Sequence, residues 1–344
     1  MDTPTNHPPL GLALRGALAA SVCLALAEWW HFEHANLAVW TTHMVTAQYP
    51  FTAFQKGVER VLGRGLGILV GLVLLTFFGN APVLALALKL LAILVFFYVY
   101  FSGRFAYTFL NAGFYLAAIV SIGVADPAAA LPQGKALLLA VVLGVAVADL
   151  IMWLTGAESD LSIRAGGQPL LPLNYRNLNH SLMLVVTVAL TQLVTSYLGL
   201  PTETTITSLM LLTIAPDIQS MFRKGELRLL GAVLGTGWAL GSLLLLVQLP
   251  HFLLLEALLF LGMFLAAYWT RTSQTYSYAG LQMGLVLPLA LVMPLREYAN
   301  IHAGLQRLEG IVTAVVMSVL VGGIWVSFGR WVAPEDSSPG AAQR

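Results

Sequence analysis

Residues 56–67 read KGVERVLGRGLG, and residues 224–235 read KGELRLLGAVLG, with seven of the twelve positions identical. Each copy keeps a lysine, an arginine and three glycines at the same spacing, although only 10% of the chain is charged. At helical spacing the arginine and the glycines share one face, and a GxxxG pair lets two helix backbones approach closely. The helix-packing residues predicted in this way are Gly63, Gly67, Gly231 and Gly235.

The composition around these copies is that of a membrane protein. The chain is 58% hydrophobic with a mean hydropathy of +0.81, whereas soluble domains are roughly 45–50% apolar. Apolar runs of about 20 residues, long enough to cross a hydrocarbon core of about 30 Å, recur along the chain. We therefore expect an all-α, polytopic integral membrane protein with about twelve spans. The expected spans are residues 10–30, 35–50, 59–78, 82–101, 104–124, 134–155, 179–199, 202–217, 225–248, 251–270, 274–294 and 304–327.

The second and eighth of these segments are short and polar, and we expect broken or tilted helices there. Orientation follows from the 17 lysines and arginines. With the N-terminus inside, thirteen lie at cytoplasmic ends or loops, three lie on the other side and Lys89 lies within a span, which is a strong positive-inside bias. Both termini are therefore predicted to be cytoplasmic.

The repeated stretch also divides the chain. Residues 1–158 form a first six-helix half, residues 159–178 a short cytoplasmic linker, and residues 179–344 a second half with a disordered C-terminal tail. Because six is an even number, both halves enter the membrane in the same direction, so the two repeats are parallel. Ala112-Gly113 and Ala279-Gly280 look like further counterparts.

The two arginines of the repeat are predicted to sit at helix N-termini, where the helix dipole is already positive. Cations there are costly unless an anion lies nearby. One interpretation is a topology signal with lipid head-group contact and tight packing. The other is a cytoplasmic site at which Arg60 and Arg228 attract an anion.

These motifs resemble those of a known family. The opening LRGALAA from Leu14 to Ala20, then Trp40, then the repeated KGxxRxxGxxxG pattern, is similar to the fusaric acid resistance and aromatic acid exporter superfamily. The resemblance implies an inner-membrane efflux component of bacteria that works with a periplasmic membrane-fusion adaptor and an outer-membrane channel. Better-known members carry a large cytosolic domain between the halves, which this chain lacks, so it resembles a compact form. The matching positions are Arg15, Arg60, Gly63, Gly67, Arg228, Gly231 and Gly235.

Charged residues inside spans are functional candidates, since they are costly in lipid. Lys89 and Glu256 occupy near-equivalent places and would either pair across a central axis or lie at the membrane edge. Asp149 would carry protons or make a structural hydrogen bond. His43 would titrate near neutral pH or pack within a hydrogen-bonded core.

Several chemistries are missing from the sequence. It contains no P-loop, HExxH or GxSxG motif, and no basic stripe for nucleic acid. Glu28, His31, Glu33 and His34 have metal-binding side chains, but no further spaced ligand follows, so we predict no metal and no cofactor.

The sequence thus favours a non-enzymatic permease that exports small organic anions, with aromatic carboxylates as the expected substrates. We expect the export to be coupled to protons, with a uniporter driven by the membrane potential as the alternative. The predicted substrate-binding residues are Arg15, Arg60, Lys89 and Arg228, and the predicted proton-coupling residues are Asp149, Glu256 and His43. Two alternatives remain: a non-transporting membrane assembly subunit and an integral-membrane enzyme that modifies lipids. Whether the chain forms a homo-oligomer is left open.

Overall fold

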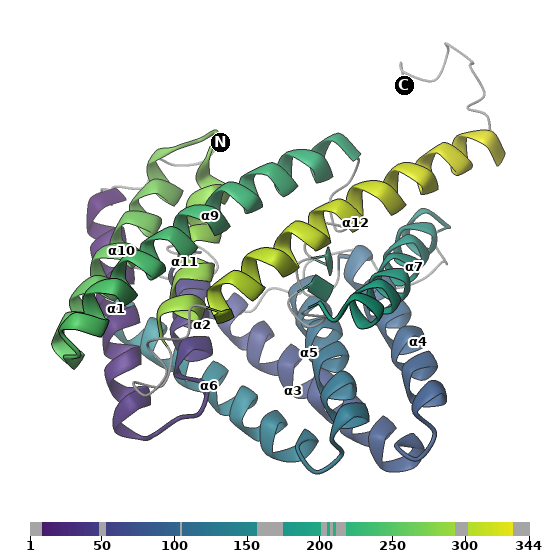
Figure 1. Ribbon diagram of the computed structural model, residues 1–344, viewed down its shortest axis with the longest axis horizontal. Coiled ribbons are helices and arrows are strands. Elements are labelled where there is room, and N and C mark those ends of the chain that lie inside the picture. Colours follow the sequence, from purple (N-terminus) through teal and green to yellow (C-terminus); the bar gives the residue numbers. More distant parts are fainter. Residues whose placement is uncertain are drawn as a thin grey trace.

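The computed structural model is built from helices that pack side by side (Figure 1). It describes residues 9–47, 53–103, 105–156, 175–200, 205–206, 209–210, 218–292 and 302–332. The helices are α1 (Pro9–Trp29), α2 (Ala35–Thr46), α3 (Ala53–Phe78), α4 (Pro82–Phe101), α5 (Ala106–Ala125), α6 (Ala130–Leu154), α7 (Tyr175–Leu198), α9 (Ile218–Gln248), α10 (Phe252–Thr272), α11 (Ser277–Leu291) and α12 (His302–Val332). Most of the predicted eighth segment, the linker and the C-terminal tail lie outside the described residues.

Within the described part of the chain, nine helices are long and apolar enough to cross a membrane. This confirms a multi-pass helical membrane protein, while the number twelve stays a prediction. α2 has 12 residues, which extend for about 18 Å at 1.5 Å per residue. It is therefore too short to cross a hydrocarbon core of about 30 Å, in keeping with the expectation of a broken segment.

Turn residues end the helices where the hydrophobic runs stop. Pro82 begins α4 at its first position, where its missing N–H and fixed φ suit a helix start. Gly156 follows α6 and Gly199 follows α7 with φ of 73° and 67°, the left-handed conformation that commonly closes a helix.

Two helices begin six or more residues earlier than predicted. α3 begins at Ala53 rather than at residue 59, and α9 begins at Ile218 rather than at residue 225. The prediction treated the charged residues before each apolar run as loop, but Lys, Glu, Gln and Arg are good helix formers. The charged turn is therefore part of the helix itself.

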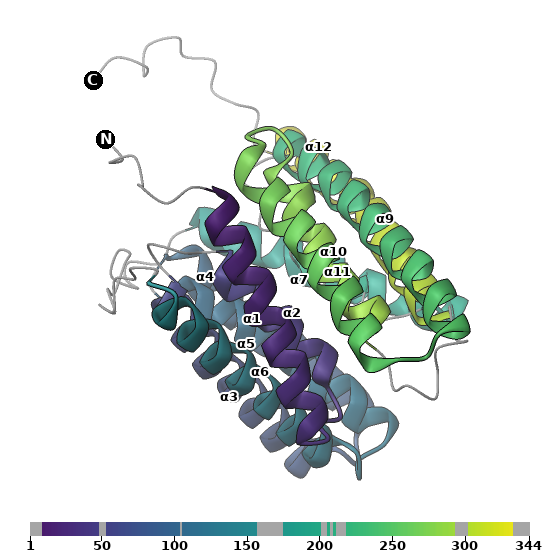
Figure 2. The ribbon, with the colours of Figure 1, turned by 90° about the vertical axis from the view of Figure 1, so that its left-hand side faces the viewer.

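The same kinds of helix pair occur in both halves of the chain. α3 packs on α5 as α9 packs on α11, α4 packs on α5 as α10 packs on α11, and α3 packs on α6 as α9 packs on α12. Among the described residues, the halves are joined where α1 packs on α10, α2 packs on α11 and α7 packs on α4. Figure 2 shows α1 between the group formed by α3–α6 and the group formed by α9–α12.

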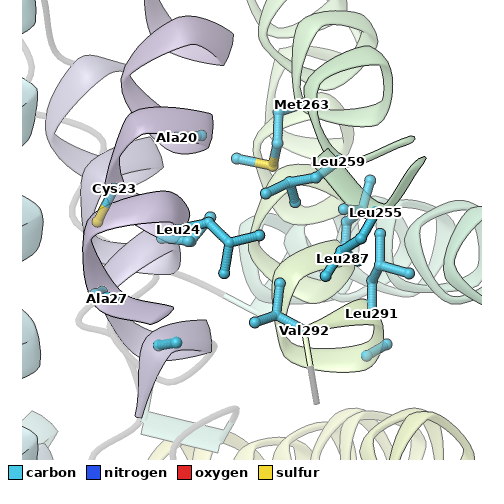
Figure 3. Close-up of a cluster of buried hydrophobic side chains, with 14 of the residues drawn as sticks. Ala20, Cys23, Leu24, Ala27, Leu255, Leu259, Met263, Leu287, Leu291 and Val292 are labelled. Carbon is cyan, nitrogen blue, oxygen red and sulfur yellow. The ribbon is translucent and has the colours of Figure 1, made fainter. Parts of the chain in front are cut away.

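The contact between α1 and α10 is apolar and close (Figure 3). Ala20 and Leu24 of α1 lie toward Met263 and Leu259 of α10, whereas Cys23 lies on the opposite side of α1. In a membrane, small residues at an interface let the helices approach, because lipid offers no hydrophobic driving force between them.

α2 is the most enclosed helix of the first half. Thr41, Thr42, His43 and Thr46 are at most 2% exposed. Thr42 donates a hydrogen bond to the carbonyl of Gly144 in α6 at 3.1 Å, and Arg271 of α10 donates to the carbonyl of Thr46 at 2.8 Å. A polar helix of the first half is thus held from both halves.

Candidate functional site

The glycines of α3 lie directly against the backbone of α5. A Cβ at Gly63 would overlap the carbonyl of Thr108 and come within 2.9 Å of the Asn111 Cβ. A Cβ at Gly67 would overlap the carbonyl of Ala112. A Cβ atom cannot come this close to the α5 carbonyls at either position, so α3 and α5 touch through their backbones at this face.

The glycines of α9 meet α11 in the same way. A Cβ at Gly231 would overlap the carbonyl of Ala279 and lie 2.7 Å from the Gln282 Cβ. A Cβ at Gly235 would lie 2.8 Å from the carbonyl oxygen of Met283. The contact surface of the first half therefore recurs in the second.

These contacts correct one of the predicted counterparts. The sequence pairs Ala112 with Ala279, but the residue of α5 that faces Gly63 as Ala279 faces Gly231 is Thr108. The spatial match between α5 and α11 is therefore displaced by four residues, about one helical turn. Two short alanine–glycine pairs can coincide in sequence, whereas backbone contact fixes the register.

Arg60 lies on this packed face and is 2% exposed. Its Nε donates to the Tyr107 hydroxyl of α5 at 3.0 Å, and its Nη2 also donates to that oxygen. The guanidinium lies 4.7 Å from the ring centroid of Trp40 in α2, and Lys56 lies 4.6 Å from the Tyr107 ring. Cations over aromatic faces are attracted by the ring quadrupole, so the two rings hold Lys56 and Arg60 in place.

Arg64 lies one turn deeper in α3 and is completely buried. Its Nη1 donates to the carbonyl of Leu137 in α6 at 2.7 Å, and its guanidinium lies 3.7 Å from the Tyr115 ring centroid. Arg64 is not among the binding residues predicted from the sequence. The signal that could have found it is an arginine inside a GxxxG face, which must point into the protein.

Arg60 and Arg228 do not lie at helix N-termini, so that prediction was wrong. Because α3 begins at Ala53 and α9 at Ile218, Arg60 and Arg228 lie about two turns or more inside their helices, at 3.6 residues per turn. The dipole acts mainly within the first turn. The free-energy cost of Arg60 and Arg228 arises instead from burial of their charged groups.

Arg228 is the counterpart of Arg60 in the second half and is 6% exposed. Its Nη1 donates to the Gln282 side chain of α11 at 2.6 Å. The position that corresponds to Arg64 is Ala232. The second half therefore lacks the second buried arginine.

Lys89 is buried on α4 and donates to Gln192 of α7 at 2.6 Å. Arg15 is half-buried on α1. Arg60, Arg228 and Lys89 each donate to a different helix, namely α5, α11 and α7.

Glu256 does not pair with Lys89, which corrects that alternative. α10 packs on α1 and α4 packs on α7, and Figure 1 places α10 and α4 on opposite sides of the molecule. Glu256 faces Ser21 of α1, and its two carboxylate oxygens are buried without a hydrogen-bond partner in the described part of the chain. The two charges lie at matching interfaces, each with its own neighbours.

The other two predicted proton-coupling residues lie near the repeated stretch and at the junction of the halves. The Asp149 carboxylate of α6 lies close to α3, 3.6 Å from where a Cβ on Gly57 would be. The His43 ring lies against Gly284 of α11, where a Cβ would come within 2.8 Å of its Cδ2. His43 Nε2 is buried and has no hydrogen-bond partner among the described residues.

The acidic and histidine side chains near the end of α1 do not assemble. His34 bonds to Gln133 at 2.8 Å, and no group of three or more metal-binding side chains occurs in the residues that the structure describes.

Carboxylates do not balance the buried arginines. Glu59, beside Arg60 in sequence, accepts a hydrogen bond from Gln55 at 2.7 Å. The ion pair recorded among the described residues joins Arg223 and Glu226 at 3.1 Å, on an exposed turn of α9. Arg60 and Arg64 therefore form a cationic pair enclosed by aromatic rings, without a carboxylate in contact within the described ranges.

Most of the first half matches a known protein family. Residues 22–151, from α1 to α6, match the family model described as "Fusaric acid resistance protein-like". No curated protein and no solved structure matches the chain. The matched segment includes Arg60, Arg64 and the glycine face of α3. Over residues 22–151, therefore, the chain is similar to fusaric acid resistance proteins, and the resemblance predicted from its motifs is confirmed there.

Proposed function

We propose that this protein is an efflux permease of the bacterial inner membrane that exports small organic anions, aromatic carboxylates first among them. The observation that carries the proposal is the pair of buried guanidiniums, Arg60 and Arg64, with no carboxylate in contact among the described residues. Taking a charge out of water is expensive unless it is paired. An anionic substrate would supply the missing charge.

The aromatic side chains around the pair favour a flat substrate. Trp40, Tyr107 and Tyr115 approach the cations from α2 and α5. Aromatic rings prefer offset-stacked and edge-to-face contacts with one another. An aromatic carboxylate would combine such a contact with charge pairing, which an aliphatic acid cannot do.

The two halves would be parallel copies of one six-helix unit. The glycine faces of α3 and α9 have matching neighbours. Helices of one half also pack on helices of the other, α1 on α10 and α7 on α4. Such repeats are common in secondary transporters, where one half moves against the other around a site near the middle of the membrane. Arg271 of the second half bonds to α2, so a movement of one half against the other would displace α2.

During export, Arg15, Arg60 and Arg228 would attract the substrate anion from the cytoplasm. Lys89 would hold it further along. Glu256, whose carboxylate oxygens are buried without a partner among the described residues, would exchange the coupled proton, with Asp149 and His43 as further proton-exchanging groups. A periplasmic membrane-fusion adaptor and an outer-membrane channel would complete the path.

Uptake of radiolabelled benzoate into inverted membrane vesicles tests the proposal. Vesicles containing the protein should take up benzoate and leave the neutral isostere benzamide outside, and a proton gradient of physiological direction should speed the uptake. Absence of benzoate uptake, with the protein folded in the membrane, would favour an assembly subunit. Modification of lipid in the same vesicles would favour an enzyme instead.

A further inference from the structure

The two edges of the Arg64 guanidinium are used differently. Nη1 donates to the Leu137 carbonyl at 2.7 Å. Nε and Nη2 are buried and have no hydrogen-bond partner among the described residues. These two nitrogens point their N–H groups in parallel along one edge of the planar group, and this fork matches the two oxygens of a carboxylate.

The corresponding edge of Arg60 is already occupied. Its Nε and Nη2 both donate to the Tyr107 hydroxyl, while its Nη1 is buried without a partner within the same described ranges. Arg60 can therefore offer a single donor, whereas Arg64 can offer a bidentate pair. The difference distinguishes two arginines that look alike in the sequence.

The neighbours of Arg64 explain why its fork stays unfilled. Tyr115 of α5 covers the face of the guanidinium at 3.7 Å and Leu137 of α6 takes Nη1, but neither offers an anion to Nε or Nη2. Arg60, about one helical turn before Arg64 in α3, adds a like charge beside it. A buried cation with a second cation beside it and two unpaired donors is costly, and a bound anion would remove that cost.

We propose that Arg64 is the residue that binds the substrate carboxylate, through Nε and Nη2. This inference rests on the proposed export of organic anions and adds the atoms that recognise the substrate. The second copy of the repeated stretch has Ala232 at the position that corresponds to Arg64, so this arginine belongs to the first copy alone. Both donors of Arg64 are closed to solvent, so the carboxylate reaches them when α3 and its neighbours separate.

Direct binding to the purified full-length protein in detergent tests this assignment. Benzoate, benzamide and inorganic phosphate serve as probes, and the shift of thermal unfolding with probe concentration gives the dissociation constant. Benzoate should stabilise the wild type, while benzamide and phosphate should not. Arg64→Lys keeps the charge but loses the fork, so its dissociation constant for benzoate should rise about tenfold or more, the value of one hydrogen bond to a charged group.

Arg64→Met is the second variant, because it removes the charge with a side chain of similar length. If Arg64 awaits an anion, this variant should be at least as stable as the wild type without benzoate, since replacing an unpaired buried charge relieves a cost, and it should lose the benzoate response. Arg223→Gln, on the exposed turn of α9, is the matched control and should bind benzoate normally.

Wild-type benzoate affinity in Arg64→Lys would overturn the assignment, as would a loss of stability in Arg64→Met with benzoate binding intact, since Arg64 would then be a structural residue. A response to phosphate in place of benzoate would overturn the carboxylate class. The proposed function fails separately: if benzoate binds at Arg64 but is never taken up into vesicles, the site stands and export does not. If Arg60→Gln abolishes uptake while both Arg64 variants bind normally, export stands and this site does not.

Discussion

The backbone contact between α3 and α5 makes a specific prediction for Gly63→Ala. The new Cβ would lie 2.9 Å from the Asn111 Cβ and overlap the Thr108 carbonyl, whereas carbon atoms in contact prefer about 3.5–4.0 Å. α5 must therefore withdraw by about 1 Å along this face. Because the obstructing atoms include backbone, we place the cost at the upper end of overpacking, about 3 kcal/mol.

Part of this cost is offset, since alanine is a better helix former than glycine by roughly 0.5–1 kcal/mol. The net expectation for Gly63→Ala is a loss of about 2 kcal/mol in the free energy of unfolding. Gly65, two residues further along α3, has no neighbouring atom within 4 Å of the place that a Cβ would take. Gly65→Ala should therefore show only the helix gain and be slightly more stable than the wild type.

Equilibrium unfolding in mixed micelles with increasing SDS measures both free energies. The two variants should differ by about 2–3 kcal/mol, given the overpacking and propensity values above. Gly231→Ala and Gly237→Ala repeat the comparison in α9, where Gly237 also has open space around it. Equal unfolding free energies for Gly63→Ala and Gly65→Ala would refute the reasoning, because the glycine face would then not be where the helices touch.

Two further predictions concern topology and charge pairing. A reporter fused after Asn80 should read periplasmic and one after Gly103 cytoplasmic, as the positive-inside bias requires; reversal of both would show that the orientation is inverted. Exchanging the charges in Lys89→Glu with Glu256→Lys should not restore transport that each single change impairs, because Lys89 bonds to Gln192 instead; full recovery in the double mutant would mean that the two charges meet during the cycle.

The parts of the fold that depend on local sequence were predicted well. The fourth span was expected at residues 82–101, and α4 is Pro82–Phe101, because hydropathy and a proline at the helix start both act within the segment. The start of α3 at Ala53 was missed, since residues that form good helices carry no hydrophobic signal. Boundaries of this kind depend on what the helix packs against.

The site was harder to predict from the sequence, because it too depends on which helices pack together. The repeated motif drew attention to Arg60, and the GxxxG pattern placed it on a packed face. The roles of Tyr107 and Gln192 required knowledge of which helices are neighbours, and these residues lie 47 and 103 positions from their partners. The open fork of Arg64 depends on the position of single nitrogen atoms, which no sequence pattern specifies.

The initial rate of benzoate uptake into inverted vesicles, compared between the wild type and Arg60→Gln at equal abundance in the membrane, tests the central claim most directly. Removing a buried charge that attracts the substrate should lower the rate by roughly tenfold or more. Arg60→Lys should fall between the two, because it keeps the charge but loses the guanidinium that bonds to the Tyr107 hydroxyl through two nitrogens. Wild-type uptake in Arg60→Gln, alone and combined with Arg228→Gln, would contradict the account and leave the repeated stretch as a packing face and a topology signal.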